Sequence, residues 1–141
     1  MKSMVTITFV LTLAAAAQAQ PAVPPAVTKA FQQAYPGAAI STTAQEHEGN
    51  RPVFRVDGVH NGKRRIVLYE AGGTAIETAE QVDEKELPKP VAAAMYSHPR
   101  AIYVSGLKVT RGGNVEYRLT FRGTRKTAMI AKPDGTVISF K

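Results

Sequence analysis

Two groups of polar residues have the types, but not the spacing, that catalysis or metal binding requires. Ser97 and His98 are a nucleophile and a base, yet neighbours on a helix diverge by about 100° and cannot form the hydrogen bond of a hydrolase dyad. Glu46, His47 and Glu48 are metal-ligating types, yet in a strand His47 points away from both glutamates. With His60 added, the spacing still matches no zinc pattern. We therefore predict no catalytic residue, no metal and no cofactor, and we expect the protein not to be an enzyme.

Basic residues form a more informative pattern. They recur at similar offsets along the chain: Arg125-Lys126 comes 61 positions after Arg64-Arg65, and Arg118 comes 63 positions after Arg55. Arg118 and Arg122 are an even number of positions apart, so on one strand they project to the same side. The residues predicted to contact a partner are Arg55, Arg118, Arg122, Arg64, Arg65, Arg125 and Lys126. The open alternative is that these charges only solubilise the strands and blunt their edges.

Two short helices are expected to pack on one face of the strands that carry these basic residues. Val27, Ala30, Phe31 and Ala34 lie at positions i, i+3, i+4 and i+7, which places them on one apolar stripe. Gly37 follows as a left-handed cap. A second stripe contains Val91, Ala94, Met95 and His98, and Pro99 ends it. Each helix therefore has one apolar face to bury.

After each helix the apolar period changes from 3.6 to 2, which is typical of strands. In the segment 116–122, Tyr117, Leu119 and Phe121 alternate with polar residues. Asn61-Gly62 and Asp134-Gly135 are among the pairs that favour hairpin turns. The predicted strands are 39–48, 53–59, 64–70, 74–81, 101–109, 114–122, 126–132 and 136–140.

The sequence also repeats itself at an offset of about 63 residues. Phe54-Arg55-Val56 is echoed by Tyr117-Arg118-Leu119, and Gly73-Thr74 by Gly135-Thr136. We therefore predict an α+β fold: a tandem repeat of one helix plus a four-stranded antiparallel sheet, with the helices packed on one face of the sheet. The repeats would span about 24–82 and 83–141, and the two sheets would join and share a core because half-size units are marginally stable.

Several helix ends and turns resemble those of a known family. The helix ending Ala34-Tyr35-Pro36-Gly37, the Phe54-Arg55-Val56 strand, the Gly72-Gly73-Thr74 hairpin, the opening Glu86-Leu87-Pro88 and the closing 132–136 hairpin are similar to small exported PepSY-like proteins. These proteins are also described as β-lactamase-inhibitor-like. The resemblance covers nearly all of residues 20–141 and implies a PepSY-like domain in the cell envelope with a binding or inhibitory role. True β-lactamase inhibitory proteins have an acidic, aromatic-rich contact face and disulfides. This chain is basic and has no tryptophan or cysteine, so none of their contact residues is assigned to it.

Residues 1–19 are typical of a cleaved signal peptide. Lys2 precedes an apolar run from Val5 to Ala17, and Ala17-Gln18-Ala19 fits the small-x-small cleavage rule. The run is shorter than the roughly 20 residues that a spanning helix needs. We therefore expect cleavage near Ala19, no membrane-spanning segment, and a periplasmic or secreted protein of residues 20–141.

Charge and compartment together restrict the partner. The formal net charge is +7, which in the cytoplasm would suggest nucleic acid, but an exported protein is not expected to meet it. The first hypothesis is a non-enzymatic envelope module that binds or inhibits a protein or peptide through the open sheet face. The alternative is a binder of an anionic small molecule, lipid or polysaccharide through a basic patch.

Overall fold

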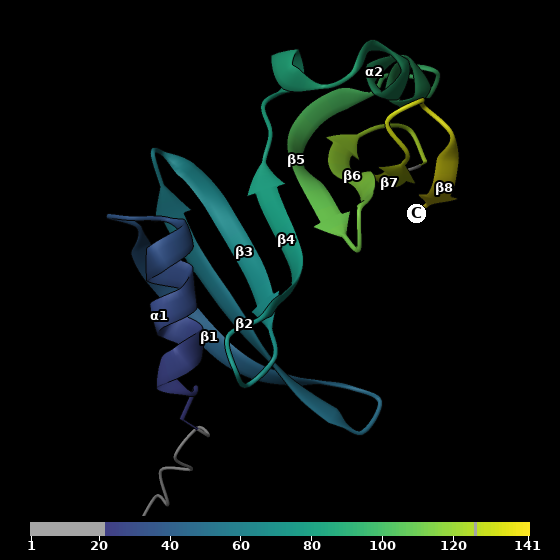
Figure 1. Cartoon of the computed structure of the whole chain (residues 1–141). Helices are drawn as coiled ribbons and strands as arrows, with labels where there is room; N and C mark the ends of the chain where they lie inside the picture. Colours follow the sequence, from purple (N-terminus) through teal and green to yellow (C-terminus); the bar gives the residue numbers. More distant parts are fainter. Residues whose placement is uncertain (1–21, 126) are drawn as a thin grey trace, which may run out of the picture.

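In the computed structural model, which describes residues 22–125 and 127–141, the strands form one eight-stranded antiparallel sheet in the order β1 to β8 (Figure 1). The first elements are α1 (Pro25–Ala34), β1 (Ala39–Glu48), β2 (Arg51–His60), β3 (Lys63–Tyr69) and β4 (Ala75–Gln81). They are followed by the 3-10 turn η1 (Glu84–Glu86), α2 (Lys89–Tyr96), β5 (Ile102–Arg111), β6 (Asn114–Arg122), β7 (Ala128–Ala131) and β8 (Val137–Phe140).

The predicted fold class is wrong. The structure is not a tandem repeat of a helix plus a four-stranded sheet, because β4 pairs directly with β5 from Glu77–Arg111 to Gln81–Leu107. The strands thus form one continuous, mostly β structure to which two short helices are added. The individual strands were predicted well, with every boundary within two residues of the observed one. The two halves were expected to join, but the strands that pair across η1 and α2 were not predicted, because turn residues mark where strands end and not which distant strand they meet.

Local sequence explains where both helices lie. Pro25 occupies the first turn of α1, where a missing N–H costs nothing. Gly37 has a φ of 79° just beyond the end of this helix. On α1, Val27 and Phe31 are fully buried, and on α2, Val91 and Met95 are fully buried. The predicted apolar stripes are therefore the faces that pack on the sheet, except that Ala34 at the end of the first stripe is exposed.

Both helices cover the same face of the sheet. Gly58 of β2 lies under the ring of Phe31, since a Cβ at this glycine would come within 3.0 Å of the ring. The strand register runs from Gly58 through Arg65, Glu80 and Lys108 to Tyr117, and paired residues project to one side. Tyr117 belongs to the hydrophobic cluster under α2. We call the opposite face of the sheet the open face.

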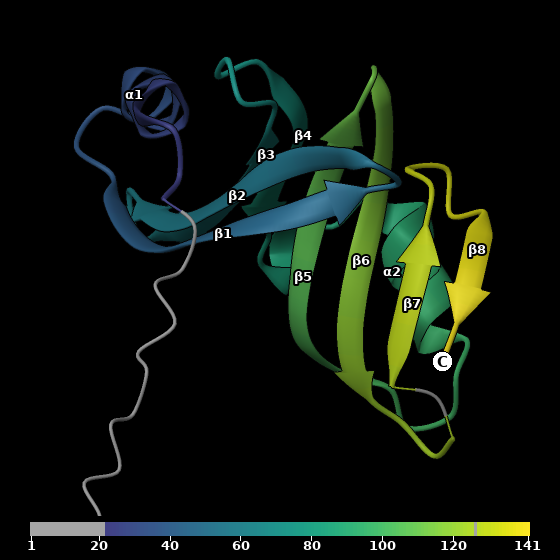
Figure 2. The same cartoon turned by 90° about the horizontal axis from the view of Figure 1, so that it is seen from below.

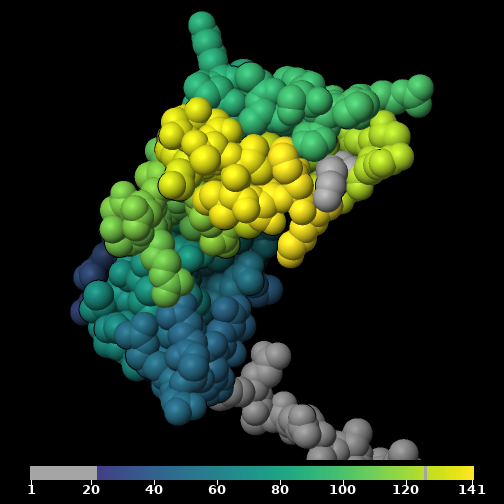
Figure 3. All heavy atoms as spheres, turned by 90° about the vertical axis from the view of Figure 1, so that its right-hand side faces the viewer, coloured from purple at the N-terminus to yellow at the C-terminus, as the bar shows by residue number. Residues whose placement is uncertain are grey.

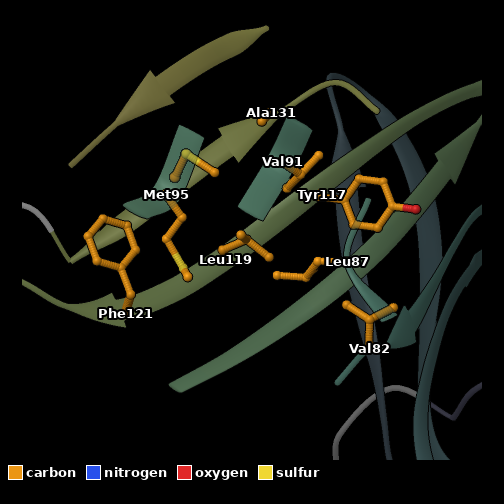
Figure 4. Packing of buried hydrophobic residues seen from close by; sticks show 9 residues of the cluster. Val82, Leu87, Val91, Met95, Tyr117, Leu119, Phe121 and Ala131 are labelled. Atoms are coloured by element: carbon orange, nitrogen blue, oxygen red, sulfur yellow. The ribbon is translucent and has the colours of Figure 1, made fainter. Parts of the chain in front are cut away.

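The buried core is divided into two clusters rather than shared. The first lies under α1 and contains Val27, Phe31, Phe54, Val56, Val67 and Tyr69. The second lies under α2, where Val91 and Met95 face Leu119 and Phe121 of β6 (Figure 4). The ladder between β4 and β5 joins the two parts. Neither helix of the described residues has the length and apolar character needed to cross a lipid bilayer.

Candidate binding face

The open face is strongly concave. Arg111 of β5 donates from Nη2 to Oε1 and Oε2 of Glu48 on β1, at 2.7 and 2.8 Å. In a flat sheet these strands would be about 19 Å apart, because three strands lie between them at about 4.8 Å per step. The end of the β1–β2 hairpin therefore curls over the open face, and it crosses in front of β5 and β6 in Figure 2.

Burial on the open face agrees with this curl. Val53 of the hairpin is 1% exposed and Val109 of β5 is 2% exposed, although both belong to the face that lacks helices. The hairpin thus covers the Val109 end of β5 and the adjoining part of β6, and it leaves the region around Ser105, Thr120 and Ser139 on β5, β6 and β8 accessible. Figure 3 shows the molecule from the side of β8, with the blue β1–β2 segment below the yellow C-terminal strands.

Charges of alternating sign line the open face. Glu77 of β4 lies between two arginines, 3.4 Å from Arg111 and 3.7 Å from Arg118. Arg118 also contacts Glu116 at 2.6 Å. At the hairpin, Glu48 accepts from both Arg111 and Arg51. The hydrogen bond from Arg111 is the main reason why the pKa of Glu48 lies below its usual value of 4.5.

The structure brings together two of the predicted arginines, Arg55 and Arg118. Both line a cavity of about 210 Å³ on the open face, together with Glu46 and Glu77. Arg55 Nη1 lies 3.6 Å from Glu46 Oε1. Arg122 is exposed and lies on the same side of β6 as Arg118. The predicted open-face set is thus located on one surface, but Arg55 and Arg118 are balanced by carboxylates.

The predicted basic hairpin edge is not a single patch. Arg64 Nε donates to both oxygens of Asp57, at 3.0 and 3.1 Å, and this contact raises the pKa of the arginine. Arg65 instead lies on the helix face, where it pairs with Glu80 at 2.7 Å and stacks on Tyr35. Adjacent residues of a strand point to opposite faces, so these two arginines cannot act together.

The second half of that predicted set lies elsewhere. Arg125 follows β6 and lines a hollow with His98, Pro99 and Thr124. Lys126 lies outside the described residues. The strand register does not bring Arg125 close to Arg64 or Arg65, which lie on β3.

The residues considered for catalysis and metal binding have structural contacts. The hydroxyl of Ser97 donates to the carbonyl oxygen of Ala94 at 2.6 Å. The ring of His98 lies against Phe121 and Phe140, with centroid distances of 5.8 and 4.0 Å. Within residues 22–125 and 127–141, no group of three or more His, Cys, Asp or Glu side chains is arranged to hold a metal ion.

The acidic half of the open face was missed by the sequence reasoning. Glu48, Asp57 and Glu77 each hold an arginine in place. Asp57 is only 8% exposed and is a lone carboxylate between valines and a glycine of β2. That pattern was a usable signal, because a buried carboxylate in a strand needs a basic partner.

Comparisons with known proteins show likeness of fold. No protein-family model and no curated protein sequence matches this chain. A crystal structure from Bacteroides eggerthii, described as a candidate periplasmic protein, is 16% identical and has a TM-score of 0.70, with 85% of this chain and 88% of that chain covered. A DUF2874 family protein from Bacteroides ovatus is 17% identical, with a TM-score of 0.63 and coverage of 84% and 86%.

A third structure, from Bacteroides fragilis, is described as BLIP-like. It is 17% identical to this chain, has a TM-score of 0.61, and covers 86% of this chain and 88% of its own. The β-lactamase-inhibitor-like part of the sequence resemblance is thereby supported at the level of fold. The PepSY-like part stays a prediction.

Proposed function

We propose that this protein is a non-enzymatic binding module of the cell envelope that holds a protein or peptide partner against its open face. The observation that carries the proposal is the concave shape of this face. Among residues 22–125 and 127–141, only the end of the β1–β2 hairpin curls over it, and the region around Ser105, Thr120 and Ser139 stays accessible to a partner. A curved sheet fits a convex loop or helix of a partner better than it fits a flat surface.

The charges of the open face support this kind of partner. Arg55, Arg118, Glu46 and Glu77 surround one cavity, and their mutual contacts fix the side chains before any partner arrives. Pre-ordered charges reduce the entropy lost on binding. A complementary partner must carry both signs of charge, which favours a protein surface over a simple polyanion.

The predicted signal peptide supports the proposed place of action in the cell envelope. The predicted signal peptide, residues 1–19, lies outside the described residues. Its tripartite pattern ends in a small-x-small site. The periplasmic description of the Bacteroides eggerthii neighbour agrees with such a location.

Site-specific crosslinking tests the proposal. A photo-reactive amino acid is placed at Thr42 or Thr120, both exposed on the open face, or at Gln32 or Ala93, which are exposed on the helices. Each variant is irradiated with an envelope fraction of the source organism, and the captured protein is identified, purified and rebound. The proposal is supported if the same protein is captured from Thr42 and from Thr120 but not from the two helix positions. Equal capture from the helix positions, or none from the open face, contradicts it.

A further inference from the structure

A second hollow lies on the accessible part of the open face. Its volume is about 540 Å³, and strands β5 to β8 form its floor. Ligand sites for small molecules generally measure about 300–1,000 Å³. This hollow is therefore large enough for a ligand of its own, although it shares Arg118 with the cavity assigned above to the protein partner.

The strand register explains which side chains enter the hollow. Leu107, Arg118, Ile130 and Ser139 are consecutive partners on β5, β6, β7 and β8. Ser105 and Thr120 are partners in a neighbouring row. Because paired residues project to the same side, aliphatic groups, hydroxyls and a guanidinium converge on this hollow.

The charged side chains among the described lining residues are all basic. Arg64 and Arg118 line the hollow, and among its described lining residues there is no Asp or Glu. The carboxylates that hold these arginines, Asp57 and Glu116, are not among the lining residues. Lys141 completes the wall, and its main-chain oxygen accepts from the amides of Thr127 and Ala128 at 2.7 and 3.2 Å.

Both arginines keep donors for a ligand. Arg64 binds Asp57 through Nε and Nη2, and Arg118 binds Glu116 through Nε and Nη2. Within the described part of the chain, Nη1 of neither arginine makes a hydrogen bond, and Nη1 of Arg118 is 3.7 Å from Glu77. A guanidinium has five N–H donors, so a bound anion can share it with a carboxylate.

We propose that the hollow binds a single-chain amphipathic anion, whose carboxylate or phosphate contacts Arg118 while its aliphatic chain lies over Leu107 and Ile130. The lining itself argues for this class. No aromatic ring is among the described residues that line the hollow, so a sugar ring would lack a stacking partner there. A small inorganic anion would leave the aliphatic floor exposed to water.

Decanoate below its micelle concentration is the probe, and calorimetry measures its binding. We expect saturable binding to the full-length mature protein, weakened about tenfold or more in Arg118→Gln and in Ile130→Glu, and unchanged in the control Lys29→Gln. Lys29 is exposed on α1. Circular dichroism establishes that each variant is folded.

A measurement on the wild-type protein makes the test independent of the variants. Addition of decanoate should shift the amide resonances of Ser105, Thr120 and Ser139 in a ¹⁵N–¹H spectrum, and decanol should shift them far less. The proposal is overturned by shifts centred elsewhere, by equal affinity for decanol, or by an absence of saturation. Binding to phosphatidylglycerol vesicles without saturable decanoate binding would assign the anionic site to a membrane surface and would also overturn it.

Discussion

Arg111 of β5 and Glu48 of β1 are in bidentate contact although β2, β3 and β4 lie between their strands in the sheet. This ion pair ties the end of the β1–β2 hairpin to the middle of the sheet. Because both side chains are solvent-accessible, the pair sets the position of the hairpin rather than the stability of the whole fold.

The first prediction is that acid releases the hairpin. The pKa of Glu48 is lowered from 4.5 in the folded state, so the stabilisation is complete above pH 4.5 and is lost as the pH falls through the folded pKa. Spin labels at Asn50→Cys and Lys132→Cys report the distance, and no native cysteine interferes.

In that experiment, Glu48→Gln at neutral pH should broaden and lengthen the distance distribution as low pH does in the wild type. Glu70→Gln is the control, since Glu70 contacts Arg51 but not Arg111. A distribution that does not change in Glu48→Gln would show that Val53 and its neighbours hold the hairpin without the ion pair.

The second prediction concerns two glycines where hairpins meet helices. Gly73 and Gly135 have φ values of 88° and 87°. A Cβ at each would lie 2.7 Å from a carbonyl oxygen, that of Ala26 or Pro90. Gly73→Ala and Gly135→Ala should each destabilise the fold by more than Gly62→Ala.

Gly62 is the matched control because its φ is 75° and a Cβ there would meet nothing within 4 Å. Its substitution should cost about 1–2 kcal/mol, the cost of a left-handed residue with a Cβ. Urea unfolding compares the three variants. Equal losses would mean that the hairpins move away from the helices at no cost.

The third prediction tests the core under α1. Phe31 is fully buried and its ring contacts Gly58, so Phe31→Ala should cost about 3–5 kcal/mol. Gln32 is exposed, and Gln32→Ala should change the free energy of unfolding by less than about 0.5 kcal/mol. Thermal melts measure both, and similar melting temperatures would contradict the orientation of the helix.

The fourth prediction separates binding from folding among the arginines. The triple variant Arg55→Ala, Arg118→Ala, Arg122→Ala should stay folded, since all three side chains lie on the open face, and it should lose the partner found by crosslinking. Arg64→Ala should instead lower the free energy of unfolding by about 1 kcal/mol, because it leaves the buried Asp57 without its main partner.

A variant carrying Ala at Arg64, Arg65, Arg125 and Lys126 completes the comparison. We expect it to retain partner binding, because Arg65 faces the helices, Arg125 lies beyond β6, and Arg64, although it lies on the open face, is neutralised by Asp57. Binding that persists in the triple variant but disappears in this one would favour the basic-patch alternative.

The fifth prediction is removal of residues 1–19. Intact-mass analysis of protein from the envelope fraction should give a chain that begins at Gln20. A chain that retains Met1 to Ala19 there would contradict cleavage.

Local features of the fold could be predicted from the sequence, and its long-range pairing could not. The alternation of Tyr117, Leu119 and Phe121 set the orientation of β6, and glycine pairs marked the turns. The β4–β5 ladder and the Glu48–Arg111 contact depend on the twist of the whole sheet, which has no local pattern.

The location of the open-face arginines could be predicted from the sequence, but the carboxylates that pair with them could not. Equivalent places in the sequence repeat favoured a common face for Arg55 and Arg118. They share a cavity because the curl of the β1–β2 hairpin carries β2 across β6. Their carboxylate partners come from other strands, so a prediction of unpaired positive charge could not hold without the register.

The curl of the β1–β2 hairpin also affects how molecules of this protein meet one another. An exposed strand at the edge of a sheet is a template for pairing with another chain. At one edge β1 is polar, interrupted by a bulge between Ile40 and Thr42, and bent over the sheet. At the other edge β8 has only four residues. Edge-to-edge growth is therefore disfavoured at both ends, which lets molecules of this protein remain dispersed while the concave surface stays available.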